Sequence, residues 1–173
     1  LPPYRSGASP GDQLWVSGTI GDAGAGLTAL REGTDAPDLI ERYRTPRPRL
    51  EAGERLAPLV TAMMDVSDGL LIDARRMAEA SSCRATIALD AVPLSDAYRA
   101  WRGESRLEAA TAGDDYELLF AARPDQATAI LALAEEIGLP FTRIGAFAAG
   151  GGLALTEDGA PVPLPARLGF EHG

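Results

Sequence analysis

The sequence contains no lysine, so all 16 of its basic residues are arginine. A P-loop needs a lysine that reaches the terminal phosphates of a nucleotide, and Schiff-base chemistry needs a lysine amine. Both kinds of site are therefore excluded from this chain. There is one cysteine, Cys83, and one histidine, His172, which we expect to be a solvated tail residue. These counts exclude an intrachain disulfide and a thiolate zinc cluster, and they argue against histidine-rich zinc sites and catalytic triads.

Long hydrophobic runs and an excess of positive charge are also missing. No apolar segment is long enough to cross a bilayer, and the opening Leu1-Pro2-Pro3-Tyr4 does not resemble a secretory signal. The formal net charge of −9 argues against nucleic-acid partners. We therefore expect a cytoplasmic protein that binds neither membrane nor nucleic acid. An acidic protein can still bind an anionic substrate when divalent cations lie between the two.

The 173 residues suffice for one full hydrophobic core. The chain opens without Met and with several turn-forming residues, which indicates a domain cut from a longer protein.

Helical and strand patterns mix without strict βαβ alternation, which predicts an α+β domain whose mixed β-sheet packs against α-helices. The expected strands are 13–18, 61–65, 85–89, 116–121, 141–147 and 153–156, and the expected helices are 21–31, a helix from residue 37, 50–59, 68–80, 94–101, 107–112 and 124–137, with an extended tail at 160–165.

The segment Met64-Asp65-Val66-Ser67-Asp68-Gly69-Leu70 lies where a predicted strand turns into a predicted helix. Its two carboxylates and the hydroxyl between them are oxygen ligands of the kind that Mg²⁺ prefers, and the first amides of a helix favour phosphate. Asp65 and Asp68 are therefore candidate metal ligands, and Ser67 is a candidate phosphate contact. The spacing fits a helix N-cap at Ser67 or Asp68 equally well. Asp73, further along the helix, is predicted to occupy a solvated face.

A second acidic segment, Gly113-Asp114-Asp115-Tyr116-Glu117-Leu118, leads into another apolar strand. On its own it is also typical of a polar turn before a strand. Its combination with the first acidic segment favours metal-dependent phosphate chemistry that is carried by carboxylates.

Arginines and glycines provide weaker candidates. Arg5 and the two arginines around Pro48 could clamp a phosphate bidentately, although most arginines only pair locally. The glycines of the segment 21–26 follow the order G-x-x-G-x-G, which is not the dinucleotide-binding fingerprint. Close packing of small residues is the favoured interpretation of that segment.

Together, these segments resemble the C-terminal domain of the thiamine-monophosphate kinase family, in the aminoimidazole-ribonucleotide-synthetase-like superfamily. The matching stretches run in the family's order: RSGASPGD at 5–12, VSGTIGDAGAGL at 16–27, RTPRPRLEAGERL at 44–56, MMDVSDGLLID at 63–73, AGDDYELLF at 112–120 and LGFEHG at 168–173. The resemblance implies that residues 1–173 are the single C-terminal domain of a two-domain kinase. The N-terminal domain, which carries further aspartates and forms a homodimer, would be absent from this chain.

The resemblance also implies the reaction. The family transfers the γ-phosphoryl group of ATP directly to thiamine monophosphate, with Mg²⁺ as cofactor, to give thiamine diphosphate. By resemblance, Asp65 and Asp68 would bind Mg²⁺, Arg5 and Ser67 would contact ATP, and Asp114 and Phe170 would contact the thiamine substrate. The family usually has a glutamate at the position of Asp114, and often a hydroxylated or larger aromatic ring at that of Phe170. No catalytic base is expected, because the acceptor is already an anion.

Two alternatives stay open at this point. One is the equivalent domain of a purine-biosynthesis synthetase, a selenide-activating enzyme or a hydrogenase maturation factor, against which the segment 114–118 and Phe170 argue. The other is a non-catalytic module that binds nucleotide or metal. In the kinase interpretation, we expect the isolated chain to fold but to have little or no activity.

Overall fold

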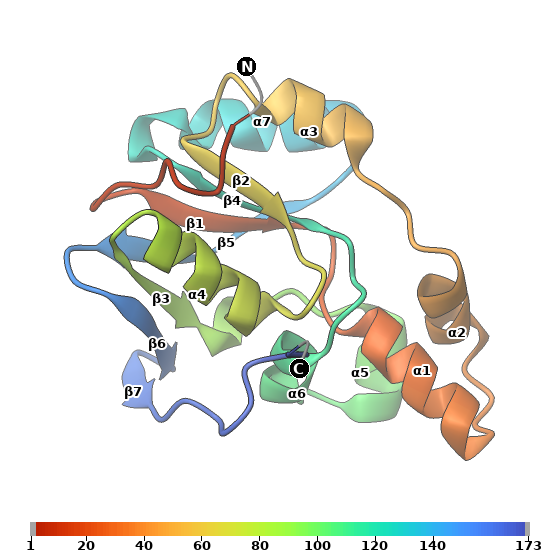
Figure 1. The fold of residues 1–173 in the computed structure, drawn as a ribbon. Helices are drawn as coiled ribbons and strands as arrows, with labels where there is room; N and C mark the ends of the chain where they lie inside the picture. The colour runs from red at the N-terminus through yellow and green to blue at the C-terminus, as the bar shows by residue number, and fades with distance from the viewer. Residues whose placement is uncertain (1–2, 172–173) are drawn as a thin grey trace.

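The computed structural model describes residues 3–171, so the prediction for His172 concerns a residue outside the described range. One mixed sheet of seven strands runs through the described residues in the order β2-β4-β1-β5-β3-β6-β7 (Figure 1). Its strands are β1 (Gln13–Ser17), β2 (Ala62–Asp65), β3 (Arg84–Ala88), β4 (Leu118–Ala122), β5 (Phe141–Ala148), β6 (Gly152–Glu157) and β7 (Ala160–Val162). The predicted α+β class with a mixed sheet is confirmed.

β1 lies inside this sheet between β4 and β5, and it is antiparallel to both. Only β3 and β6 pair in parallel. Because side chains alternate along a strand, Leu14 and Val16 of β1 join one hydrophobic cluster and Trp15 joins another. Both faces of the sheet are therefore buried at β1.

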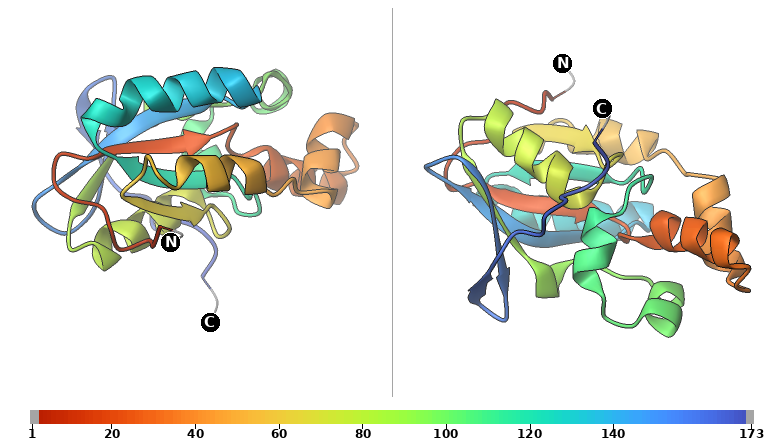
Figure 2. Two further views of the ribbon diagram at one scale, coloured as in Figure 1. Left: turned by 90° about the horizontal axis from the view of Figure 1, so that it is seen from above. Right: turned by 60° about the horizontal axis from the view of Figure 1, so that its bottom comes forward.

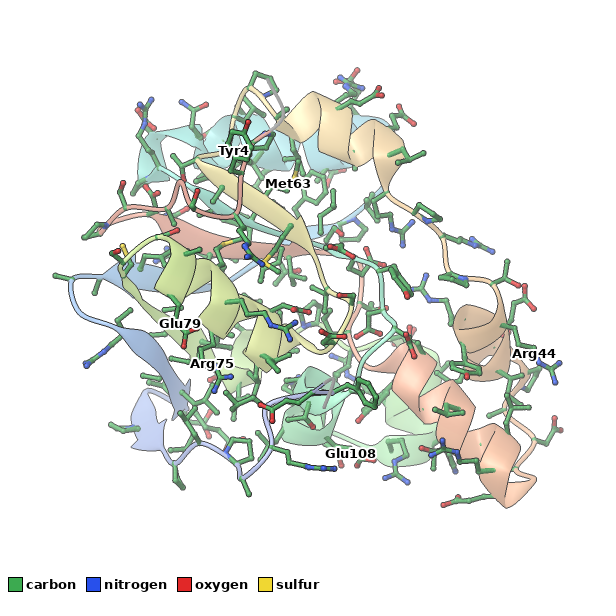
Figure 3. All side chains as sticks on the ribbon, viewed as in Figure 1. Tyr4, Arg44, Met63, Arg75, Glu79 and Glu108 are labelled. Carbon is green, nitrogen blue, oxygen red and sulfur yellow. The ribbon has the colours of Figure 1, made fainter. Side chains whose placement is uncertain are left out.

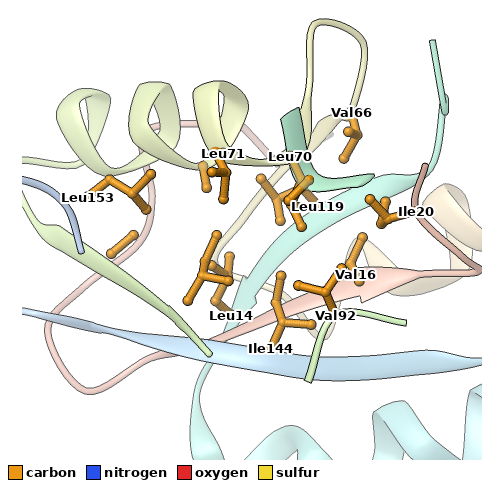
Figure 4. Packing of buried hydrophobic residues seen from close by; sticks show 14 of the residues in the cluster. Leu14, Val16, Ile20, Val66, Leu70, Leu71, Val92, Leu119, Ile144 and Leu153 are labelled. Carbon is orange, nitrogen blue, oxygen red and sulfur yellow. The ribbon is translucent and has the colours of Figure 1, made fainter. Parts of the chain in front are cut away.

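The larger cluster lies on the face covered by α4 (Leu70–Ala80). Leu70 and Leu71 of this helix pack toward Leu14, Val16 and Leu119 of the sheet (Figure 4). The predicted apolar face of this helix is thus confirmed.

The smaller cluster lies on the opposite face, under α3 (Leu50–Leu56) and α7 (Ala127–Ile137). Trp15 stacks on Phe120 with 6.3 Å between ring centroids, and Phe141 meets Phe120 edge-on at 5.6 Å. Figure 1 shows α3 and α7 on one side of the sheet and α4 on the other. None of the described helices is both long and apolar enough to cross a membrane.

α1 (Asp22–Glu32) and α2 (Pro37–Arg44) form a helical pair that projects beyond one end of the sheet (Figure 2). A Cβ atom at Gly26 would collide with the backbone carbonyl of Leu39, so the glycine allows the two helices to approach closely. At Gly26, the predicted role in close packing is confirmed. The remaining elements are α5 (Asp96–Arg102), α6 (Arg106–Thr111) and the short 3₁₀ helices η1 (Leu89–Ala91) and η2 (Pro124–Gln126).

Several element boundaries differ from the prediction by one to three residues, and two of them lie beside the acidic segments. The strand expected from residue 116 begins at Leu118, because Asp114 and Tyr116 have φ angles of 67° and 51°, in the left-handed region. The helix expected from residue 68 begins at Leu70, because Gly69 has a φ of 135° that no helix contains. The hydrophobic pattern, from which the boundaries were predicted, does not depend on these φ angles.

Candidate functional site

The two acidic segments lie side by side at one end of the pair β2 and β4, which are antiparallel with Asp65 opposite Leu118. Backbone bonds continue the pairing beyond the strands. The amide of Val66 donates to the Glu117 carbonyl, and the amides of Tyr116 and Asp114 donate to the carbonyls of Val66 and Ser67, each at 2.8 Å. The turn after β2 is therefore fastened to the segment before β4 along its whole length.

The C-terminal tail joins this arrangement. The amide of Phe170 donates to the carbonyl of Asp68 at 2.8 Å, and the Phe170 side chain is 62% exposed. Residues from three distant parts of the sequence thus meet around Ser67 and Asp68. Only the tertiary structure could bring Phe170 to the acidic segments.

Asp73 holds the turn, and the prediction that it is solvated is wrong. Its side chain is fully buried. Its Oδ2 accepts hydrogen bonds from the amides of Ser67 at 3.0 Å and Asp68 at 3.1 Å. Burial raises the pKa of Asp73, and the bonds from the Asp68 amide, the Arg76 side chain and the Ser67 amide act in the opposite direction. A carboxylate inside the protein, one turn into α4, therefore shapes the loop that carries the candidate ligands.

The helix-cap alternative for the first acidic segment is also wrong. The N-cap of α4 is Gly69, and no side chain caps the helix. The amides of Ser67 and Asp68 donate to Asp73, which lies inside the helix. The side chains of Asp65, Ser67 and Asp68 are therefore not used as helix caps.

Asp68 bonds to a neighbouring cation. Nη1 of Arg76 donates to Oδ2 of Asp68 at 2.6 Å and to Oδ1 of Asp73 at 2.9 Å. The hydrogen bond with Asp68 is the main cause that raises the pKa of Arg76. One guanidinium thus links the half-buried Asp68 to the buried Asp73.

A hollow of about 650 Å³ lies over this arrangement, and we call it the Phe170 hollow. It contains four of the six candidate site residues: Ser67, Asp68, Asp114 and Phe170. Its other lining residues come from α1, the acidic segments and the residues before them: Gly24, Leu27, Arg31, Ala112, Gly113 and Tyr116.

Asp65 lines a second hollow of about 590 Å³ beside α3, which we call the Leu50 hollow. Its walls are mostly apolar, and its lining residues are Pro3, Pro48, Arg49, Leu50, Gly53, Glu54, Ala57, Met63, Asp65, Tyr116 and Leu118. Arg5 lines neither hollow and is exposed. Its neighbour Tyr4 lies along β2, where the Tyr4 carbonyl accepts the Met63 amide at 3.3 Å (Figure 3). The six candidates therefore divide among two hollows and an exposed segment at the edge of the sheet.

The acidic segment before β4 also contains Glu117, a buried carboxylate that accepts several hydrogen bonds and that was not among the predicted site residues. Glu117 is 1% exposed, and its carboxylate accepts bonds from Ser17 Oγ at 2.6 Å, Arg42 Nη2 at 3.1 Å, and Arg49 Nε and Nη2 at 2.9 and 2.7 Å. Arg49 is thus engaged in local pairing, as one of the two earlier interpretations held. One signal in the sequence was that Glu117 lies two positions before the apolar Leu119 in the strand expected from residue 116, since alternate residues of a strand share a face. Both residues are buried.

Asp115 is buried on the same face. Both of its carboxylate oxygens accept the amide of Gly21 at 3.1 Å, at the start of α1. Burial raises the pKa of Asp115 well above its usual range, and the nearby charges of Asp22 and Glu117 raise it further, against the bond from Gly21. Asp115 and Glu117 therefore anchor the segment, and the alternating residues Asp114 and Tyr116 are exposed.

The donor set decides which metal could fit. Within residues 3–171, no group of three or more His, Cys, Asp or Glu side chains is arranged to hold a metal ion. Asp65 and Asp68 provide hard oxygen donors only, which suit Mg²⁺, an ion that keeps several waters and needs only one or two carboxylates besides substrate phosphates. The chemistry of these two carboxylates would suit a magnesium ion whose other ligands were water and substrate phosphates.

Comparisons with known proteins identify the family to which the chain belongs. Residues 9–158 match the family described as AIR synthase related protein, C-terminal domain. The thiamine-monophosphate kinase of Caulobacter vibrioides is 41% identical over 98% of this chain and 50% of that protein. A crystal structure of thiamine-monophosphate kinase from Stenotrophomonas maltophilia is 39% identical, with a TM-score of 0.85 over 92% of this chain and 54% of that one. A structure described as AaThiL complexed with AMPPCP and TMP is 30% identical, with a TM-score of 0.79 over 96% of this chain and 53% of that one. The chain spans about half the length of the curated relatives it matches.

Proposed function

The chain belongs to the AIR synthase related protein family as its C-terminal domain, and from this membership we propose that it is half of a thiamine-monophosphate kinase. The whole enzyme would transfer the γ-phosphoryl group of ATP to thiamine monophosphate. Relatives that match nearly the whole chain carry this name, and one solved relative is described with an ATP analogue and TMP. These names favour the kinase over the other superfamily members and over a non-catalytic module.

One observation carries the proposal. Backbone hydrogen bonds fasten the turn after β2, the segment before β4 and the tail at Phe170 together. Ser67, Asp68, Asp114 and Phe170 from these three segments line one hollow. Carboxylates, a hydroxyl and an exposed aromatic ring therefore share one surface. This is a surface that could hold two phosphorylated molecules together with the cations that neutralise them.

The proposed roles follow from the chemistry of each group. Asp65 and Asp68 would bind Mg²⁺, which supplies charge neutralisation between the two polyanions when it is bound. Ser67 and Arg5 would donate hydrogen bonds to ATP. Asp114 would accept from the thiamine substrate, and Phe170 would lie against its rings.

No residue of the chain is proposed as a general base. The acceptor oxygen belongs to a phosphate that is already ionised, so the protein has to position the two substrates and exclude misaligned encounters. The carboxylates suit this task even at a net charge of −9, because cations lie between them and the substrates.

The rest of the site would come from an N-terminal domain of the same protein, which would also form a homodimer. This domain would complete the Mg²⁺ coordination that residues 3–171 leave partial. We also propose a cytoplasmic location, which fits a chain whose only cysteine is a buried free thiol.

The proposal is tested with the full-length protein, Mg-ATP and thiamine monophosphate. We expect Asp65→Asn and Asp68→Asn to lower kcat at least about tenfold, because each removes half of a charged ligand pair. Asp125→Asn, at an exposed aspartate that pairs only with surface groups, is the matched control. Unchanged rates in both site variants would refute the metal assignment. Nucleotide binding without turnover in the wild type would favour the non-catalytic module.

A further inference from the structure

Arg76 on α4 places a positive charge on Asp68, one of the two proposed magnesium ligands. Its Nη1 atom donates to Oδ2 of Asp68 at 2.6 Å and to Oδ1 of Asp73 at 2.9 Å. This nitrogen carries two hydrogens, so each carboxylate can receive one of them. The guanidinium therefore neutralises two carboxylates that would otherwise repel each other around one nitrogen atom.

The two carboxylates depend on Arg76 to different degrees. The Asp73 side chain is fully buried, so a charge there needs a partner inside the protein. The Asp68 side chain is 16% exposed and lines the Phe170 hollow, so a hydrated cation can reach it from that side. Arg76 is not a lining residue of the hollow and approaches Asp68 from α4. Asp68 can therefore exchange Arg76 for another cation, whereas Asp73 cannot.

Arg76 can release Asp68 without leaving a buried charge unpaired. The Arg76 side chain is 32% exposed, so water can hydrate the guanidinium when it gives up one hydrogen bond. The other hydrogen bond, to Asp73, can remain. The second oxygen of Asp73 still accepts the amides of Ser67 and Asp68, which keeps the turn in shape. The partner of the Asp68 carboxylate can thus change while the backbone around it stays fixed.

We propose that Arg76 is a positioning residue that neutralises Asp68 in place of a metal ion and releases it when Mg²⁺ binds. This inference rests on the proposed role of Asp68 as a magnesium ligand. Because a guanidinium and a divalent cation beside the same carboxylate repel each other, Arg76 weakens the binding of the free ion. A metal ion that arrives with a triphosphate brings negative charge that offsets this repulsion. Arg76 therefore favours the metal–nucleotide complex over free Mg²⁺.

The experiment titrates Mg²⁺ into the full-length protein by calorimetry, at constant ionic strength so that general screening does not change. Arg76→Gln removes the charge and keeps a polar side chain. We expect it to bind Mg²⁺ about tenfold more tightly, because a unit charge beside a divalent ion has an effect of that size even at the dielectric constant of water. Arg76→Lys keeps the charge, so we expect its Mg²⁺ affinity to stay within about threefold of the wild type.

The direction of the change separates this role from a merely structural one. Arg76→Gln removes the charged partner of the buried Asp73, so we expect the melting temperature without Mg²⁺ to fall. A variant that had only lost structure would bind Mg²⁺ more weakly. Displacement predicts the opposite combination, in which a less stable variant binds Mg²⁺ more tightly and gains more thermal stability when Mg²⁺ is added.

Two further variants complete the experiment. The matched control is Arg75→Gln, which removes the neighbouring charge on α4. Arg75 pairs with the exposed Glu79 at 3.6 Å and with the exposed Glu171 at 3.8 Å. We expect this control to leave Mg²⁺ affinity within about twofold, because exposed charges are screened by solvent. Asp68→Asn identifies the part of the signal that belongs to Asp68, because Mg²⁺ bound elsewhere in the protein remains in that variant.

The preference for the metal–nucleotide complex is tested with AMPPCP. The same variants are titrated with AMPPCP at saturating Mg²⁺. We expect Arg76→Gln to bind AMPPCP within about threefold of the wild type, since the triphosphate offsets the repulsion that acts on the free ion. A gain for AMPPCP as large as the gain for Mg²⁺ alone would overturn the preference.

The outcomes also separate this inference from the function on which it rests. Mg²⁺ binding that is the same in the wild type and in Asp68→Asn overturns the metal assignment and the inference with it. If Asp68→Asn weakens Mg²⁺ binding while Arg76→Gln leaves it unchanged or weakens it, the inference alone is overturned. Equal tightening in Arg76→Gln and Arg75→Gln also overturns it, because the effect would then be one of general charge. A wild type that binds Mg²⁺ but not AMPPCP overturns the proposed kinase and the nucleotide preference, and the exchange at Asp68 is then decided by the Mg²⁺ titrations.

Discussion

Glu117 offers the sharpest test of what holds the site segments in place. Its buried carboxylate joins Ser17 at the end of β1, Arg42 on α2 and Arg49 before α3. Glu117→Gln keeps the shape of the side chain but turns one acceptor oxygen into a donor. Both oxygens of Glu117 accept hydrogen bonds from Ser17 or the arginines. The NH₂ group of the glutamine therefore faces at least one of these donors, whichever way the amide is turned, and that donor loses its acceptor.

The magnitude follows from burial. Removing one partner of a buried ion pair costs about 3–5 kcal/mol, because the other charge stays without compensation. Arg42 and Arg49 are 25% and 20% exposed, so water can partly solvate them after the change. We therefore expect a loss of about 3 kcal/mol in the free energy of unfolding, at the lower end of that range.

Urea unfolding followed by circular dichroism measures this loss. With a slope of about 2 kcal/mol per molar urea, the midpoint should fall by about 1.5 M. The control is Glu136→Gln, which breaks the surface pair with Arg55, where the two side chains are 64% and 38% exposed. We expect this control to change stability by less than about 0.5 kcal/mol. A loss below about 1 kcal/mol in Glu117→Gln would mean that the arginines find other partners, Asp22 being 3.8 Å from Arg42.

Three further predictions concern the same region and its support. Burial raises the pKa of Asp115, so the folded state keeps this proton to higher pH than the unfolded chain does. The stability due to the protonated form is therefore complete below the usual carboxyl pKa of about 4 and is lost as the pH rises through the folded-state pKa. Asp115→Asn stays neutral, so its advantage in unfolding free energy over the wild type should grow with pH in urea titrations; an advantage independent of pH would contradict this. Asp73→Ala leaves the amides of Ser67 and Asp68 without their acceptor, and we expect faster hydrogen exchange at both amides and a loss of about 1–3 kcal/mol; unchanged exchange would show that the turn holds itself. Gly26→Ala places a Cβ atom against the Leu39 carbonyl and should lower the melting temperature, although alanine normally favours a helix, whereas Gly151→Ala has open space and should leave it unchanged.

The pattern of hydrophobic residues was enough to predict the elements. The short apolar runs predicted six strands within a few residues of their bounds, and the alternation in β1 and the helical spacing in α4 both reflect burial. β7 was only predicted to be extended, because a strand of three residues has no period to read. Propensity and periodicity depend on residues that are close in the sequence, so they can be read from the sequence without knowledge of the fold.

Backbone details at the acidic segments could not be predicted in this way. The left-handed conformations of Asp114 and Tyr116 exist because the turn after β2 pairs with them, a partner that is far away in the sequence. The same is true of Asp73, because an aspartate is the type of residue that usually lies on a solvated face. It is buried because α4 packs against the very turn that it supports.

The sequence by itself determined the class of the chain and the chemistry it can carry. The lack of lysine, the acidic segments and their resemblance to one kinase family depend only on residue types and order. The tertiary structure decided which of these residues share a surface. It set Asp114 and Phe170 beside Ser67 and Asp68, placed Asp65 in the separate Leu50 hollow, and paired Arg49 with Glu117. These relations depend on pairings between residues up to a hundred positions apart, and their energies come from burial and hydrogen bonds that no local pattern encodes.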